Sequence, residues 1–161
     1  MKVVVAKTQK EIIDNMLIRG YVFVIEQEID WEIEYDGLDQ ECVLFTAYLD
    51  DLAVGAARLY KNKVGRVATL KEYRNQGVAT KIMEEIEKYA LEQKIPCLKL
   101  HAQLYVKDFY EHLDYIVQGE IFQEADIDHV LMTKEINWWT KKNRKKSQSR
   151  HSIKLGLRLI K

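Results

Sequence analysis

The chain has 161 residues, of which 47% are hydrophobic and 31% are charged, with one proline and seven glycines. This length fits one domain with a sizeable core, and the periodic hydrophobic pattern excludes disorder over most of the chain. No apolar run reaches the roughly 18 residues of a membrane-spanning helix, and MKVVVAKTQKE does not resemble a secretory signal. Two cysteines, Cys42 and Cys97, give neither a disulfide framework nor metal-ligand spacing. We therefore expect a cytoplasmic protein without a metal site.

The net charge of zero hides an uneven distribution. Residues 141–161 contain nine basic residues and no acid, whereas residues 1–140 carry 25 acids and 16 bases. We divide the chain into a folded domain at residues 1–137 and a basic tail at residues 138–161. The tail is interpreted either as a solvated, disordered appendage or as an edge strand, and its charge suits an anionic partner.

The first elements follow from local patterns. The β-branched run at residues 2–6 predicts a strand. Thr8 and Glu11 form a capping box that begins a helix, and Gly20 predicts a break or bend before Val24. The apolar face expected to pack on the core comprises Ile12, Ile13, Met16, Leu17 and Tyr21.

Residues 26–41 form a different kind of segment, with eight acids and no base. We interpret it as a second helix or an irregular segment that lies over the rest of the domain. Its carboxylates would attract a cationic ligand, and they fit a solvated acidic face equally well. Both interpretations stay open at this point.

The remaining pattern alternates strands and helices. Strands are predicted at residues 43–49, 53–60 and 63–70, joined by short polar links that are typical of hairpins. Residues 77–93 predict the longest helix, which Pro96 prevents from continuing. The elements predicted after it are a strand at 97–103, a short helix at 106–113, and strands at 115–122 and 127–136. Hairpins combined with a strand–helix–strand unit predict an α+β domain with a mixed sheet.

The turn that leads into the longest helix is the most informative feature. Residues 67–79, VATLKEYRNQGVA, end a strand, turn through polar residues and open a helix at Gly77. The first turn of a helix has about four free N–H groups, and a glycine lets an anion approach them. The turn lacks the lysine and hydroxyl residue of a P-loop and the three glycines of a dinucleotide fingerprint. A phosphate site and a simple tight turn both fit these residues.

RNQGVA at residues 74–79 matches the Q/R-x-x-G-x-G/A motif of the GNAT superfamily of acyl-CoA-dependent N-acyltransferases. Further similar segments are VFV at 22–24, EQ at 26–27, HAQ at 101–103, FYE at 109–111, and residues 124–132. Over residues 2–136 the chain resembles the small bacterial YjcF/ElaA-like branch of that superfamily. The resemblance implies the GNAT fold: a mostly antiparallel, twisted sheet of about seven strands, splayed between strands four and five and flanked by about four helices.

The resemblance also implies acetyl-CoA as co-substrate and no metal. Main-chain groups at the end of the fourth strand would bind the pantetheine arm, and the following loop would bind the diphosphate. The residues expected to bind coenzyme A are Val67, Ala68, Thr69, Arg74, Asn75, Gln76, Gly77, Val78, Ala79, Thr80 and Phe109.

Two further positions carry the expected chemistry. Tyr110 takes the place of the tyrosine that, in many GNAT enzymes, protonates the departing thiolate, although its apolar helix face fits a core tyrosine as well. Glu26 is the first candidate for the base that deprotonates the amine. Further candidates on the acceptor side are Glu28, Glu124 and His129. His129 also fits an ordinary strand histidine.

These residues predict an N-acetyltransferase that moves an acetyl group from acetyl-CoA to a primary amine by direct attack in a ternary complex. The acceptor is expected to be a small-molecule amine or a protein lysine, and the sequence does not define which. The alternative is a coenzyme A-binding module with little turnover that acts through its basic tail on a nucleic acid or protein. We expect no membrane partner, nucleic-acid contact only through the tail, and leave a homodimer open.

Overall fold

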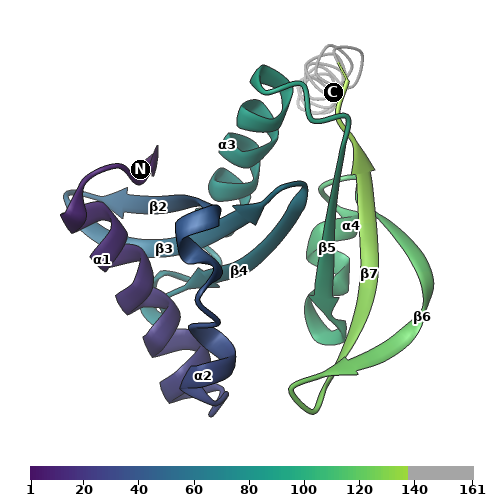
Figure 1. Cartoon of the computed structure of the whole chain (residues 1–161), viewed down its shortest axis with the longest axis horizontal. Helices are drawn as coiled ribbons and strands as arrows, with labels where there is room; N and C mark the ends of the chain where they lie inside the picture. The colour runs from purple at the N-terminus through teal and green to yellow at the C-terminus, as the bar shows by residue number, and fades with distance from the viewer. Residues whose placement is uncertain (138–161) are drawn as a thin grey trace, which may run out of the picture.

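The computed structural model describes residues 1–137, which form a seven-stranded sheet with helices packed against it (Figure 1). The strands are β1 (Lys2–Val5), β2 (Val43–Leu49), β3 (Leu52–Tyr60), β4 (Lys63–Thr69), β5 (Cys97–Gln103), β6 (Ile116–Glu124) and β7 (Ile127–Glu135). The predicted tail strand lies outside the described residues. No helix within residues 1–137 is long and apolar enough to cross a membrane.

The sheet has the strand order β1-β2-β3-β4-β5-β7-β6. Every neighbouring pair is antiparallel except β4 and β5, which are parallel and share only the pairs Lys63↔Lys99 and Val64↔Leu100. Beyond these pairs the two strands diverge, and Figure 1 shows the sheet as two arms joined at this point. The predicted sheet of about seven mostly antiparallel strands, splayed between the fourth and fifth, is confirmed.

The helical segments connect the strands in the predicted order. They are α1 (Gln9–Arg19), the π-helix η1 (Gly20–Glu26), α2 (Trp31–Glu34), the 3₁₀ turns η2 (Leu38–Glu41), η3 (Lys71–Tyr73) and η4 (Leu104–Val106), α3 (Val78–Glu92) and α4 (Lys107–Glu111). The capping box at Thr8 and Glu11 is confirmed. At Gly20 the helix does not break but continues in the π register, and a Cβ there would lie 2.7 Å from the Tyr35 hydroxyl. Gly20 therefore permits the close approach of Tyr35.

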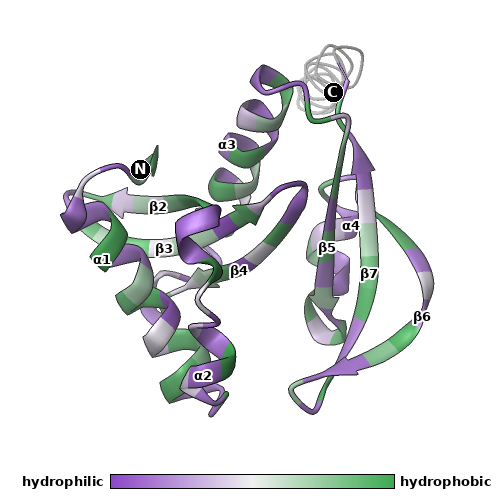
Figure 2. Cartoon of the chain, viewed as in Figure 1, coloured by the Kyte–Doolittle hydropathy of each residue, from purple (hydrophilic) through white to green (hydrophobic). Residues whose placement is uncertain are grey.

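The predicted core face of α1 is wrong for three of its five residues. Ile13, Leu17 and Tyr21 are 45%, 54% and 56% exposed, and Figure 2 shows hydrophobic stretches along the outer surface of α1. Asn15 and Arg19 are fully buried instead. The Asn15 amide donates to backbone carbonyls of both β2 and β3, so hydrogen bonds satisfy the buried polar group. Hydrophobic periodicity could not reveal a polar contact of this kind.

Two hydrophobic cores lie on the two faces of the sheet. One packs α1 and η1 against β3 and β4, and the larger one packs α3 against the other face. Gly55 in β3 makes α3 fit closely, because a Cβ there would lie 2.6 Å from Val78 and 2.8 Å from Ile82. This close approach fixes the beginning of α3 beside the divergence of β4 and β5.

Candidate active site

Two clefts lie along the gap between β4 and β5. The loop cleft, about 670 Å³, is lined by the end of β4, the turn before α3 and α4. The hairpin cleft, about 680 Å³, is lined by α2 and by the β6–β7 hairpin. Residues that line both clefts are Phe23, Val67, Gln103, Val106 and Tyr110. The shared residues mean that ligands in the two clefts can meet.

The beginning of α3 presents backbone donors to the loop cleft. Its N-cap, Gly77, has a φ of 80°, and no side chain of residues 1–137 caps the helix. The first helical hydrogen bond runs from the Lys81 N–H to the Gly77 carbonyl at 2.9 Å, which leaves the N–H groups of residues 78–80 without a helical acceptor. A Cβ on Gly77 would meet no atom within 4 Å, so the space next to these donors is open.

The end of β4 presents further main-chain groups. Because the Leu70 N–H donates to Val54 in β3, the alternation of a strand turns the backbone groups of Thr69 toward the gap. The pairing of β3 and β4 shifts register between Ala56 and Arg58, which places Arg66 and Val67 together opposite Ala57 in a bulge. The Thr69 hydroxyl is buried without a hydrogen-bond partner among the described residues. The Thr69 carbonyl accepts from Arg74 Nε at 3.1 Å, so a ligand that enters the gap would find the Thr69 hydroxyl unsatisfied, and not the carbonyl.

The structure brings nearly all predicted coenzyme residues together. Gln76 is the exception, since it does not line the loop cleft and its side chain donates to the Glu72 carbonyl at 2.9 Å. The others that line the cleft are Val67, Ala68, Thr69, Arg74, Asn75, Gly77, Val78, Ala79, Thr80 and Phe109. Three short runs of residues, 67–69, 73–75 and 77–80, thus form one wall of the loop cleft.

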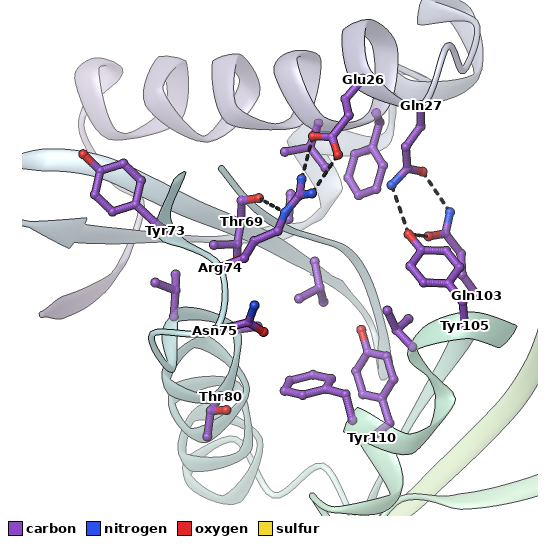
Figure 3. A pocket seen from close by; sticks show the side chains of 18 of the residues that line it. Glu26, Gln27, Thr69, Tyr73, Arg74, Asn75, Thr80, Gln103, Tyr105 and Tyr110 are labelled. Atoms are coloured by element: carbon purple, nitrogen blue, oxygen red, sulfur yellow. Dashed lines mark hydrogen bonds and ion pairs between the residues drawn. The ribbon is translucent and has the colours of Figure 1, made fainter. Parts of the chain in front are cut away.

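Tyr110 stands where the two clefts meet. Its side chain is only 7% exposed, and its ring packs on Phe109 and Tyr115. Figure 3 shows its hydroxyl pointing into the loop cleft, with no hydrogen bond to another residue drawn. Burial raises the pKa of the Tyr110 phenol, which keeps it protonated at neutral pH. The Tyr110 ring belongs to the core while its hydroxyl faces the cleft. The interpretation as a core tyrosine is therefore compatible with the one as a proton donor.

The predicted acceptor-side residues are separated by the structure. Glu26 lines the loop cleft, where it forms an ion pair with Arg74 at 2.6 Å. The hydrogen bonds from Arg74 lower the pKa of Glu26, so it is a weaker proton acceptor than an ordinary glutamate. Glu28 lines neither cleft, whereas Glu124 and His129 line the hairpin cleft. The geometry therefore argues against Glu26 as the base.

The hairpin cleft contains an acid–base cluster that the sequence did not reveal. His101 Nδ1 lies 2.7 Å from Glu124 Oε1, and Lys63 Nζ lies 3.1 Å from the same ring nitrogen. Burial raises the pKa of Glu124, but the hydrogen bond to His101 and the charge of Lys63 outweigh it and lower the pKa overall. In the tautomer with the proton on Nδ1, His101 donates to the Glu124 carboxylate and its Nε2 lone pair has no partner among the described residues; in the other tautomer Nδ1 accepts from Lys63 instead. A nitrogen in this state can take up a proton.

His129 occupies a less open position in the same cleft. It is 8% exposed, and its Nδ1 lies 2.8 Å from the Ile127 carbonyl, to which it can donate. Its position agrees with the interpretation as an ordinary strand histidine.

The carboxylates of residues 26–41 do not form a free acidic face. Three of them lie in a cluster of ion pairs that forms one wall of the hairpin cleft. The cluster comprises Arg19, Arg58, Arg66, Glu34, Asp36 and Asp39. Arg19 Nε lies 2.6 Å from Glu34 Oε1, and the two side chains are 0% and 2% exposed. Arginines neutralise three of the eight charges, so neither interpretation holds for the whole segment, whereas Glu28, Asp30, Glu32 and Glu41 are exposed, as the solvated face predicts.

Sequence reasoning also missed four polar residues around the gap. They are Gln27, Lys63, His101 and Gln103, all of which line one of the clefts. A signal for two of them was available in β5, where residues 98, 100 and 102 are buried and the residues between them are less so. This alternation turns His101 and Gln103 away from the core and toward the clefts.

Comparison with known proteins decides the family. Residues 20–136 match the family model of the Acetyltransferase (GNAT) domain. The chain belongs to the GNAT family. It is 34% identical over 140 residues to the uncharacterized N-acetyltransferase YjcF of Bacillus subtilis (strain 168), covering 84% of this chain and 100% of YjcF. As a GNAT protein it is an acyltransferase.

Solved structures agree with this fold. An acyl-CoA N-acyltransferase from Pseudomonas aeruginosa has a TM-score of 0.75 at 24% identity, covering 83% of this chain and 99% of that one. An aminoglycoside 6′-N-acetyltransferase complexed with coenzyme A has a TM-score of 0.66 at 15% identity, covering 85% of this chain and 98% of that one. The GNAT fold predicted from the sequence is confirmed.

Proposed function

We propose that this GNAT protein transfers an acetyl group from acetyl-CoA to a primary amine in a ternary complex. The loop cleft holds the coenzyme and the hairpin cleft holds the acceptor. The observation that carries this proposal is the meeting of the two clefts at Tyr110, with unsatisfied main-chain donors on one side and an acid–base pair on the other. This arrangement would place a thioester beside an amine, which is the main task for an already activated acyl donor.

The coenzyme would bind mainly through the backbone. The N–H groups of residues 78–80 suit the diphosphate, because they lack acceptors and lie beside the open space at Gly77. Val67, Ala68 and Thr69 suit the pantetheine arm, since their strand edge faces a gap with no partner strand. Coenzyme A bound to a structure with the same fold supports this assignment.

The transfer is proposed to proceed by direct attack. The neutral amine forms a bond to the thioester carbonyl carbon, a main-chain N–H at the β4 gap stabilises the oxyanion, and the carbon–sulfur bond then breaks. Tyr110 gives its proton to the departing thiolate. The proton lost by the amine passes to His101 Nε2, whose imidazolium the Glu124 carboxylate stabilises. His101 with Glu124 thus takes the role first considered for Glu26.

The proposal is tested by mixing the full chain with acetyl-CoA and a panel of amines and measuring release of free thiol. The panel contains tyramine, spermidine, kanamycin and a lysine-containing peptide, and coenzyme A binding is measured separately by calorimetry. We expect saturable binding and thiol release that depends on an amine. Binding without release across the panel would favour the coenzyme-binding module, and absence of binding would refute the whole proposal.

A further inference from the structure

Glu26, at the end of η1, is bound to the β4 arm of the splayed sheet above the loop cleft (Figure 3). Its two carboxylate oxygens accept hydrogen bonds from Arg74 Nη1 and Nη2 at 2.7 and 2.6 Å. Arg74 Nε donates to the Thr69 carbonyl at 3.1 Å. The end of η1 is therefore linked, through one arginine, to the backbone of the last residue of β4.

The next residue, Gln27, is bound to the β5 arm. Gln103 Nε2 donates to Gln27 Oε1 at 2.9 Å, and the Gln27 amide lies 3.4 Å from the Tyr105 hydroxyl. The Tyr105 hydroxyl in turn donates to Gln103 Oε1 at 2.7 Å. Two adjacent residues of one helical segment thus connect the two strands that diverge, which share only two residue pairs with each other.

The contacts of Arg74 also limit what its side chain offers to a ligand. Each of its three guanidinium nitrogens has a partner, and the carboxylate of Glu26 neutralises its charge in a two-point geometry. A diphosphate in the loop cleft would therefore face the neutral Arg74–Glu26 ion pair and not a free arginine. The unsatisfied amides at the beginning of α3 would meet it as free donors.

We infer that Glu26 and Gln27 form a clasp that sets the width of the gap between β4 and β5 for the coenzyme. Glu26, Gln27 and Arg74 are positioning residues in this assignment. Arg74 acts through the Thr69 carbonyl and not as a ligand of the diphosphate. The inference rests on the proposed binding of coenzyme A, and it assigns Glu26 a role different from that of a base.

The test measures coenzyme A binding by calorimetry for the wild type, Glu26→Gln, Arg74→Gln and the double variant. A clasp predicts that each single change raises the Kd about 10-fold and that the double change raises it no further, because both remove the same link. If Arg74 instead bound the diphosphate, Glu26→Gln would leave the Kd unchanged or lower it, while Arg74→Gln would raise it. That pattern would overturn the inference.

Further variants separate positioning from folding. The Glu26–Arg74 side chains are 38% and 36% exposed, so the melting temperature of the unliganded variants should change by less than about 2 °C. Glu32→Gln, an exposed change on α2, is the matched control with an unchanged Kd. Gln27→Ala and Tyr105→Phe cut the other side of the clasp without removing a charge, and each should raise the Kd about 3-fold. An unchanged Kd in both would refute the clasp, whereas a wild type that does not bind coenzyme A would refute the proposed function instead.

Discussion

The two clefts have nearly the same volume but are built in different ways. About half of the residues that line the loop cleft come from one short segment, residues 67–80. The hairpin cleft is lined by apolar and charged side chains from segments far apart in the sequence, which meet only in the folded chain. A short motif can therefore encode the first cleft, while the second depends on tertiary packing. The difference also predicts how each cleft responds to substitution.

The largest effect, a loss in the free energy of unfolding, is expected for the cluster of ion pairs beside the hairpin cleft. Arg19→Met removes a fully buried cation and leaves Glu34, 2% exposed, with one fewer partner. Breaking a buried ion pair on one side typically costs about 3–5 kcal/mol, because the remaining charge stays buried. We expect urea denaturation to show a loss of this size in the free energy of unfolding.

The matched control for this change lies on the same helix. Lys10→Met breaks an ion pair in which the lysine is 71% exposed, and it should cost at most about 1 kcal/mol. Equal losses in the two variants would contradict the claim that buried charge pairs hold this cluster together.

The second largest effect concerns Tyr110, one of the residues that line both clefts. Tyr110→Phe removes the proposed proton donor while leaving the packed ring in place, so we expect kcat to fall about 100-fold. The Kd for coenzyme A should stay within about 2-fold of the wild type. The measurement is thiol release with the best amine of the panel, and Tyr89→Phe on α3 is the control. A kcat unchanged by Tyr110→Phe would restrict this tyrosine to the core.

The contrast between the clefts also explains what the sequence could predict. The Gly77 turn and the succession of strands and helices along the chain follow from periodicity and a local motif, and the resemblance to the GNAT superfamily implied the splayed sheet and the place of Tyr110. The acid–base pair of His101 and Glu124 joins residues 23 positions apart, and its partners depend on how the β6–β7 hairpin folds over β5. The burial of Arg19 depends on carboxylates 15 and 20 positions away, so the pattern of its own helix could not predict it.

The third prediction concerns the Kd for coenzyme A when Gly77 of the loop cleft is replaced. Gly77→Val places a β-branched residue at a φ of 80°, so the loop should relax to another conformation in the free protein. Coenzyme A would then have to restore the original loop, at a cost of about 2 kcal/mol or about 30-fold in Kd. Gly37→Val introduces the same strain at a φ of 79°, outside the loop cleft. If both variants weakened binding equally, the effect would come from general destabilisation and not from the loop.

The smallest effect is the pH dependence of the free energy of unfolding that comes from the Asp36–Arg58 ion pair beside the hairpin cleft. Hydrogen bonds from Arg58 lower the pKa of Asp36 to about 2, compared with about 3.9 for an unfolded aspartate. The stabilisation from this pair is therefore complete above about pH 4 and is lost as the pH falls toward 2. Because the Asp36 side chain is 28% exposed, we expect it to account for only about 1–2 kcal/mol. Urea denaturation at pH 5 and pH 2.5 should show a smaller acid-induced loss for Asp36→Asn than for the wild type. Asp51→Asn, an exposed change in the β2–β3 turn, should follow the wild type, and identical losses in all three proteins would show that this ion pair does not contribute to acid sensitivity.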